Sequence, residues 1–184
     1  MKSWTNLSYA NVATTSPAAH KASMEWSDAL ARGGAAEFDG EAEKNAMMPL
    51  RRAAARLLSC EVADVCVGSS ATELLCSLAW AVSPSGGSNI VSTRTAFPST
   101  VYPWSRVAEA NGAKIRLANH DEELYTNPDD ILDLIDEATS VVTLSHVEYS
   151  TGQRYDLRRF ADAAHSVGAL LVVDASQSMG MVPI

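Results

Sequence analysis

The chain has 184 residues, of which 47% are hydrophobic and 20% charged, and its formal net charge is −8 at pH 7. This composition is typical of a folded domain with a sizeable core and argues against disorder. The excess of 22 acidic over 14 basic residues argues against nucleic acid as a partner, because phosphate contacts need basic patches. No apolar segment approaches the roughly 20 residues that span a bilayer, so we expect no membrane partner.

The cysteines and the N-terminal residues indicate in which cellular compartment the protein is expected. Cys60, Cys66 and Cys76 are odd in number, lie in apolar surroundings and lack a C-x-x-C spacing. Neither a disulfide framework nor a metal site is therefore expected. The first residues also lack the apolar core of a secretory signal, and together these features predict a cytoplasmic protein.

Helices and strands are predicted to alternate along the chain. The expected helices cover residues 17–31, 49–60, 71–82, 99–112, 127–138 and 156–168. The expected strands cover residues 64–67, 89–92, 114–118, 140–145 and 169–173. Each strand is a short continuous apolar run, which indicates a mostly parallel sheet with helices on both faces. The predicted fold class is therefore α/β, with three layers in the order α-β-α.

Polar or aromatic clusters follow four of these strands, at the edge where parallel α/β sheets bind ligands. The clusters are 68-GSSATE-73, 93-TRTAFPST-100, 146-HVEYSTG-152 and 174-DASQ-177. Three of them have ordinary structural interpretations. The first can be a tight turn with a helix cap, Phe97 can be a core residue, and base rates favour a hydrogen-bonded structural role for His146.

Asp174 is harder to explain as a structural residue, because a carboxylate at the end of a buried strand needs a cation or several donors. A protonated ring nitrogen would be a suitable partner. The helix start after Gly68 suits a phosphate, although its spacing is neither that of the P-loop nor G-x-G-x-x-G. Phe97 can cover a flat ring. These features predict a pocket for pyridoxal 5′-phosphate (PLP), an electron sink that such an acid makes effective.

Five motifs, in register over most of the chain, resemble the class V aminotransferase group of fold-type I PLP enzymes. That group includes cysteine desulfurases, selenocysteine lyases and isopenicillin-N-epimerase-like proteins. The motifs are 9-YANVATTSP-17, 68-GSSATE-73, 96-AFPSTVYPW-104, 145-SHVEYSTGQRYDL-157 and 172-VVDASQSMG-180. The resemblance implies that residues 1–48 are an N-terminal helix and substrate-entrance segment, and that residues 49–184 are part of the PLP-binding large domain.

The resemblance also implies roles for individual residues. Ser70, Ala71 and Thr72 would bind the phosphate of the cofactor, and Phe97 would stack on its pyridine ring. Asp174 would pair with the ring nitrogen, and Gln177 would form a hydrogen bond with the phenolic oxygen of the ring. The substrate side would be formed by Ala13, Thr14, His146 and Tyr149. Phe97 stands where the group often has His, and Tyr149 stands where cysteine desulfurases usually carry Asn. Phe97 can still stack on the ring but cannot relay protons as His does, and Tyr149 favours the epimerase-like or aminotransferase-like branch.

The Schiff-base lysine of this group follows the Asp-x-x-Gln motif further along the chain. The four lysines here are Lys2, Lys21, Lys44 and Lys114, so we expect no catalytic residue among these 184 residues and a sheet that is incomplete at its C-terminal end. Whether the chain is itself an enzyme is left open.

The expected function is that of the N-terminal part of a PLP-dependent enzyme acting on an amino acid. We expect it to be inactive without a lysine-bearing second half, and to form a homodimer or to pair with a complementing chain. The alternative is a non-catalytic fragment or partner subunit that binds another protein through an exposed sheet edge. A doubly wound nucleotide-binding domain is a weaker option, because the glycine fingerprint is missing.

Overall fold

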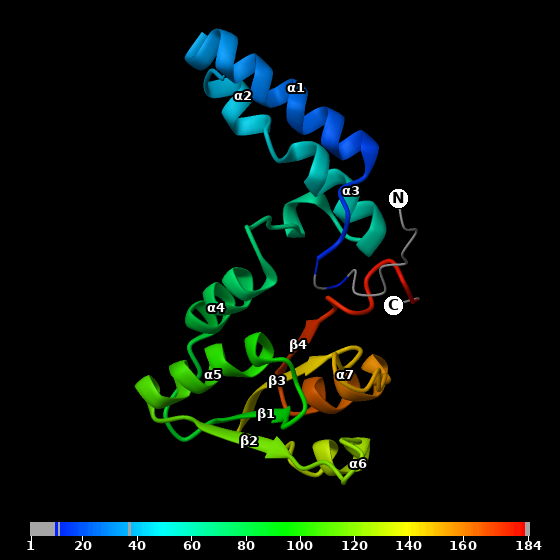
Figure 1. Cartoon of the computed structure of the whole chain (residues 1–184). Helices are drawn as coiled ribbons and strands as arrows, with labels where there is room; N and C mark the ends of the chain where they lie inside the picture. The colour runs from blue at the N-terminus through cyan, green and yellow to red at the C-terminus, as the bar shows by residue number, and fades with distance from the viewer. Residues whose placement is uncertain (1–9, 11, 37, 183–184) are drawn as a thin grey trace. The chain divides into compact units, whose positions relative to one another are not determined.

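The computed structural model describes residues 10, 12–36 and 38–182 (Figure 1). The chain divides into two compact units, residues 1–67 and 68–184, and each is described by itself. The division predicted at residue 48 separates a substrate-entrance segment from a cofactor-binding part, so it concerns function and stays a prediction.

The first unit is helical in its described part. It contains α1 (Pro17–Gly33), η1 (Gly34–Ala36), α2 (Gly40–Asn45), α3 (Met48–Leu58) and η2 (Val62–Asp64). The helix starts follow the expected capping chemistry, in which a side-chain oxygen accepts a free backbone N–H. The Ser16 hydroxyl accepts from Ala19 N at 3.2 Å at the start of α1, and the Asp39 carboxylate accepts from Ala42 N at 2.9 Å at the start of α2.

The strand predicted at residues 64–67 is not present. Arg51 of α3 holds this stretch by donating from Nε to Val65 O at 2.9 Å and from Nη2 to Val62 O at 2.8 Å. A strand needs a neighbour for its backbone groups, and no described strand pairs with this stretch. The prediction was therefore wrong, because a short apolar run forms a strand only where another strand pairs with its backbone.

The second unit contains a parallel sheet of four strands in the order β2-β1-β3-β4. The strands are β1 (Asn89–Thr93), β2 (Lys114–Ala118), β3 (Thr139–Ser145) and β4 (Leu170–Asp174). The helices are α4 (Ala71–Val82), α5 (Pro98–Asn111), α6 (Pro128–Leu132) and α7 (Leu157–Ser166). Apart from the short α6, these elements match the predicted ones to within a few residues.

Helices cover both faces of this sheet, which confirms the predicted α/β layers (Figure 1). Successive strand residues point to opposite faces. Ile90 of β1 packs with α4 and α5 through Ala79 and Trp104, whereas the next residue, Val91, packs with α7 through Phe160. The continuous apolar strands therefore feed two cores, one on each face.

α6 begins as predicted but ends early. Asn127 caps it by accepting from Asp129 N at 3.1 Å, and Pro128 occupies the first turn. The predicted continuation to residue 138 is wrong, because Asp136 accepts from Ala138 N at 3.0 Å. Such a side-chain bond to the local backbone stabilises a turn in competition with the helix.

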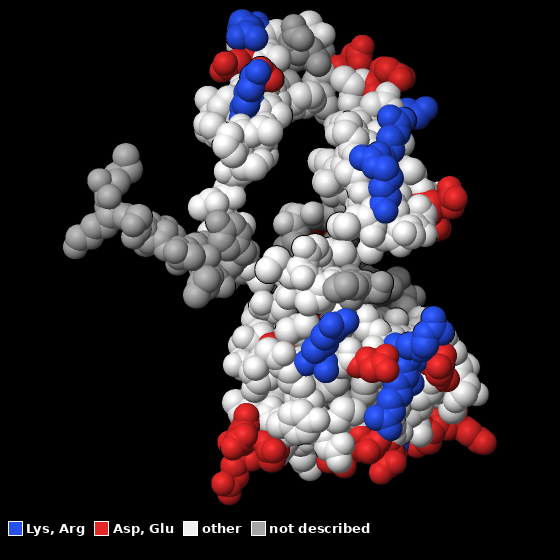
Figure 2. Space-filling view, turned by 90° about the vertical axis from the view of Figure 1, so that its right-hand side faces the viewer, with Lys and Arg blue, Asp and Glu red and all other residues white. Residues whose placement is uncertain are grey.

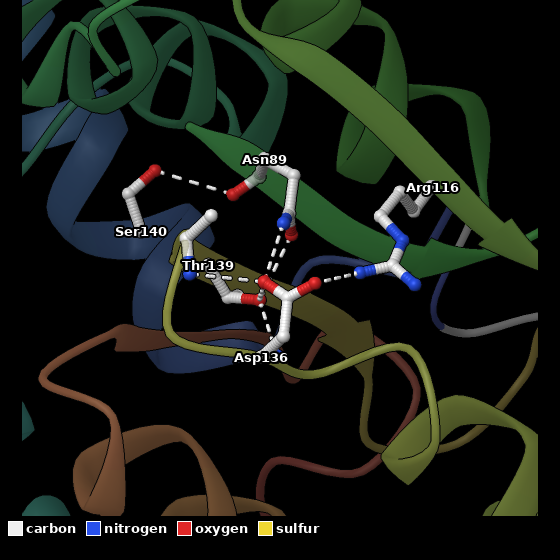
Figure 3. A network of polar contacts seen from close by, with 6 residues as sticks. Asn89, Arg116, Asp136, Thr139 and Ser140 are labelled. Carbon is white, nitrogen blue, oxygen red and sulfur yellow. Dashed lines mark hydrogen bonds and ion pairs between the residues drawn. The ribbon is translucent and has the colours of Figure 1, made fainter. Parts of the chain in front are cut away.

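The same aspartate anchors the amino-terminal end of the sheet (Figure 3). Asp136 accepts from Asn89 Nδ2 at 2.8 Å and pairs with Arg116, and Thr139 Oγ1 donates to Asn89 Oδ1 at 2.8 Å. The hydrogen bond from Asn89 is the main cause that lowers the pKa of the Asp136 carboxyl. The first residues of β1 and β3 are thus tied together, at the end of the sheet opposite to the predicted ligand edge.

The surface carries both signs of charge. Figure 2 shows acidic and basic side chains interspersed over the second unit, and the described basic residues form no continuous patch on the face drawn. Among the described helices, none is long and apolar enough to cross a membrane. The described His, Cys, Asp and Glu residues form no group of three or more that could hold a metal ion.

Candidate functional site

The first turn of α5 connects the clusters that follow the strands. Ser99 Oγ lies 2.7 Å from Thr72 Oγ1, at the start of α4. The next residue, Thr100, is fully buried and donates from Oγ1 to Asp174 Oδ2 at 3.0 Å. One helical turn therefore holds the predicted phosphate loop on one side and the predicted ring-nitrogen partner on the other.

Phe97, which directly precedes α5, packs against the cluster after β3. Its ring lies edge-on to that of Tyr149, with centroids 5.1 Å apart and an interplanar angle of 85°. Both rings are accessible, at 42% exposure for Phe97 and 52% for Tyr149. The two aromatic residues predicted from separate motifs are thus neighbours, and Phe97 has accessible surface for a flat ring to cover.

Asp174 is almost buried, with 9% of its surface exposed. Its Oδ1 accepts from Ser176 N at 2.9 Å, and its Oδ2 accepts from Thr100. Within the described residues no cation pairs with it. A nearly buried carboxylate with two donors and no counter-charge fits a positively charged ligand atom, which is what the protonated ring nitrogen of PLP would supply.

The start of α4 offers backbone donors rather than hydroxyls. Ser70 Oγ is used as the helix cap, accepting from Glu73 N at 3.1 Å. The N–H groups of Ala71 and Thr72 lie in the first turn, where a helix supplies no acceptor, and no described residue outside the helix accepts from them. These two N–H groups at the positive helix end fit an anion.

Glu73 adds a negative charge to the same loop. It accepts from both the backbone N and the hydroxyl of Ser69, each at 2.6 Å. These bonds, the one from the hydroxyl first, lower the pKa of the Glu73 carboxyl. A Cβ at Gly68 would lie 2.8 Å from Leu74 Cδ2, so a larger residue would require the Leu74 side chain to shift. The two Ser69 donors are thus engaged by Glu73, whereas the backbone N–H groups of Ala71 and Thr72 remain available to a ligand.

His146 is a buried residue with mainly structural contacts. It is 2% exposed, its backbone N donates to Asp174 O at 2.9 Å, and its Nε2 accepts from Arg154 Nε at 3.4 Å. Burial, followed by the charge of Arg154, lowers the pKa of the imidazole. The structure therefore places His146 beneath the site as a neutral ring, and its role toward a substrate stays a prediction.

Three further predicted residues are exposed. Gln177 lies in the turn after β4, three residues beyond Asp174, and makes no hydrogen bond to the described residues. Ala13 and Thr14 belong to the first unit, so they are not among the residues that the second unit brings together. The predicted roles of these three residues stay predictions.

Sequence reasoning missed Glu148. This carboxyl is 1% exposed and accepts from Thr93 Oγ1 at 3.2 Å, while its second oxygen has no described partner. Burial is the main cause that raises the pKa of Glu148, and the nearby charge of Asp174 raises it further. Tyr155 behaves similarly, and burial raises the pKa of its phenol to about 12. The signal was an acid three residues after the end of β3, close to the pattern that drew attention to Asp174.

Glu148→Gln is expected to raise stability at neutral pH and to leave it unchanged in acid. Because the folded protein raises the pKa of Glu148, folding favours its protonated form, and stability is lost as pH rises through that pKa. Melting temperatures at about pH 4 and about pH 7 check this. Glu137→Gln, on an exposed residue, is the control, and the same shift at both pH values would contradict the expectation.

The chain is similar to curated proteins with two activities. It is 35% identical over 98 residues to a probable cysteine desulfurase of Methanothermobacter thermautotrophicus, and the match covers 53% of this chain and 24% of that protein. It is 34% identical over 97 residues to a kynureninase of Pseudomonas fluorescens, covering 52% of this chain and 22% of that protein. The matched stretch therefore spans about a quarter of these relatives' own length.

Solved structures show the same fold. The cystine C–S lyase C-DES, in complex with its reaction product cysteine persulfide, matches with a TM-score of 0.83 at 19% identity, covering 96% of this chain and 48% of that chain. The cysteine desulfurase CsdA of Escherichia coli matches with a TM-score of 0.78 at 22% identity, covering 92% and 44%. At such identities the likeness concerns the fold.

The sequence pattern of one family covers nearly the whole chain. The sequence model of the family described as "Aminotransferase class-V" matches residues 11–184. That range contains the start of α4, the first turn of α5 and the end of β4, which carry the described site. The chain belongs to the aminotransferase class-V family.

Proposed function

We propose that the second unit binds PLP and that the protein acts on an amino acid as part of a PLP-dependent enzyme. The observation that carries this proposal is the nearly buried, unpaired Asp174 carboxylate, held by the same helical turn that contacts the start of α4. The relatives support it, since a variant of C-DES carries glycine covalently linked to its PLP cofactor.

Each residue of the site would have a distinct task toward the cofactor. Asp174 would keep a proton on the ring nitrogen, and Thr100 with the Ser176 N–H would orient the carboxylate. Phe97 would cover one face of the ring. When bound, PLP supplies an electron sink for carbanion chemistry at the substrate. The turn from Phe97 to Thr100 would thus set the position of the ring.

The phosphate would be held by the start of α4. The N–H groups of Ala71 and Thr72 and the Thr72 hydroxyl would donate to it, with the helix dipole favouring its charge. Ser70 would act indirectly, since its hydroxyl caps the helix. Gln177 would donate to the phenolic oxygen of the ring.

The substrate side is a further part of the proposal. Tyr149, beside Phe97, would face the substrate, and His146 would support it from below. Ala13 and Thr14 would belong to the entrance. We propose a reaction in the range of the matched relatives, cleavage of a bond between the β-carbon of an amino acid and the atom beyond it, as in a C–S lyase. The assembly would be cytoplasmic, either a homodimer or a pair with a complementing second chain.

Titration of the purified protein with PLP, followed by tryptophan fluorescence, tests the cofactor assignment. Thr72→Ala is expected to weaken PLP binding by about 1–2 kcal/mol, as for one lost hydrogen bond to a charged group. Ser77→Ala, on an exposed residue of the same helix, is the matched control and should bind as the wild type does. Saturable binding that neither substitution changes would place PLP elsewhere.

A further inference from the structure

A cavity of about 370 Å³ lies beside Phe97, and none of the six predicted cofactor residues lines it. Its walls come from the segment between Thr93 and Tyr102, from the end of β2, and from the loops that follow β2 and β3. This volume lies within the range of small-molecule pockets. The lining includes Ala96 and Pro98, on either side of Phe97, and also Tyr149, which packs against Phe97. The cavity therefore adjoins the proposed ring site without including its cofactor residues.

The polar part of the lining is basic. Arg94 and His120 are the ionisable cations of the lining, and no Asp or Glu belongs to it. Arg94 Nε donates to Asn119 Oδ1 at 2.8 Å, and its backbone N donates to Ala118 O at 3.1 Å. No described residue bonds its two terminal nitrogens. In a chain of net charge −8, an oriented guanidinium with both terminal groups available indicates an anionic ligand.

His120 is oriented in a similar way. Its Nδ1 lies 2.7 Å from Asp121 O. Because a carbonyl oxygen can only accept, Nδ1 carries the proton and donates. Nε2 has no described partner and is left for a ligand or for solvent.

The loop that carries His120 is held in one conformation. Asp121 Oδ1 accepts from Glu123 N and Tyr125 N, each at 2.9 Å. Within this turn Leu124 adopts φ +64°, a left-handed conformation that non-glycine residues rarely adopt, and it lines the cavity. Observed strain of this kind is concentrated at ligand sites.

A glutamine fixes this loop to the one that follows β3. Gln153 Oε1 accepts from Thr126 N at 3.0 Å, and Gln153 Nε2 donates to Thr126 O at 2.6 Å. The loops after β2 and β3, which both contribute residues to the cavity wall, are therefore joined by a pair of hydrogen bonds. A cavity with such fixed walls loses less conformational freedom when a ligand binds.

We propose that this cavity binds a small monocarboxylate with an apolar body. The carboxylate would lie on the terminal nitrogens of Arg94, and the hydrocarbon part would pack against Val101, Leu117 and Leu124. A phosphate fits less well, because a doubly charged group would meet a single permanent cation and apolar walls. The proposal does not depend on PLP binding, since none of the six predicted cofactor residues lines the cavity. Tyr149, which we assign to the substrate side, does line it, so the cavity borders the proposed active site.

The test uses 3-phenylpropanoate as the probe and its neutral amide as the matched comparison, both titrated into the purified wild-type protein by calorimetry. The acid is expected to bind about tenfold or more tightly than the amide, as for a hydrogen bond to a charged group. Equal binding of the two, or no binding of the acid, would overturn the proposal.

Variants locate the binding. Arg94→Gln is expected to weaken binding of the acid by about tenfold or more and to leave binding of the amide unchanged. Arg106→Gln is the matched control, because Arg106 is an exposed residue of α5 that pairs with Glu109 and does not line the cavity. Equal effects of the two substitutions would overturn the location. Saturating PLP should not displace the probe, and competition between them would mean one shared site.

Discussion

Asp174→Asn is expected to weaken PLP binding by about tenfold or more, the largest functional effect of any single substitution in the site. The amide keeps the size of the side chain and can still accept from Ser176 N. It cannot balance the positive charge of a protonated ring nitrogen, and that charge would then lie nearly buried without a partner. Fluorescence titration of the variant with PLP measures the loss directly, without reference to any reaction.

Two controls make this result specific. Asp162→Asn removes the same charge from an exposed position on α7 and should leave PLP affinity unchanged. The melting temperature of Asp174→Asn without PLP should stay close to that of the wild type, since the amide oxygen can accept from Ser176 N and the amide NH2 can donate to Thr100 Oγ1, whose hydroxyl can also accept. Unchanged PLP affinity in a folded Asp174→Asn protein would remove the main support for the proposed cofactor site.

Phe160→Ala is expected to lower the free energy of unfolding by about 3–5 kcal/mol. Phe160 of α7 is fully buried, and its ring packs edge-on against that of Tyr155 with centroids 5.7 Å apart. The substitution leaves a cavity in the core cluster that Phe160 shares with Tyr155 and Leu144. Because domains are stable by only about 5–15 kcal/mol, this loss should be evident in urea or thermal unfolding.

A graded series separates packing from other causes. Phe160→Leu keeps most of the buried volume and should cost clearly less than the alanine variant. Arg158→Ala changes an exposed residue on the same helix and should cost less than about 0.5 kcal/mol. If the alanine variant is no less stable than the leucine variant, the buried volume of the Phe160 ring does not stabilise this core as we expect.

The second unit was predictable because its local signals agree with its packing. Residues 89–93, 114–118, 139–145 and 170–174 are apolar runs between helices, and in the structure they are the parallel strands. Asn127 with Pro128 correctly predicted the start of α6. The end of that helix was missed, because the Asp136 side chain competes with the helix through bonds to the turn and to β1, and the second of these exists only in the folded sheet.

The sequence indicated which residues to consider for the candidate site, but not which of them are in contact. Asp174 and Phe97 stand out in the sequence because each follows an apolar strand. Ser99 and Thr100 did not, since hydroxyl residues at a helix start are common. Their importance depends on which residues lie opposite, namely Thr72 and Asp174.

The amino-acid sequence by itself determined the class of fold and the family, because these depend on periodicity and on motifs that are contiguous in the chain. Tertiary structure alone decided that one turn of α5 joins the clusters, that Glu148 is buried, and that residues 64–67 are held by Arg51 and not by a strand. Burial and hydrogen bonding depend on residues distant in sequence, so a local pattern can indicate which side chains need partners but not which partners they find.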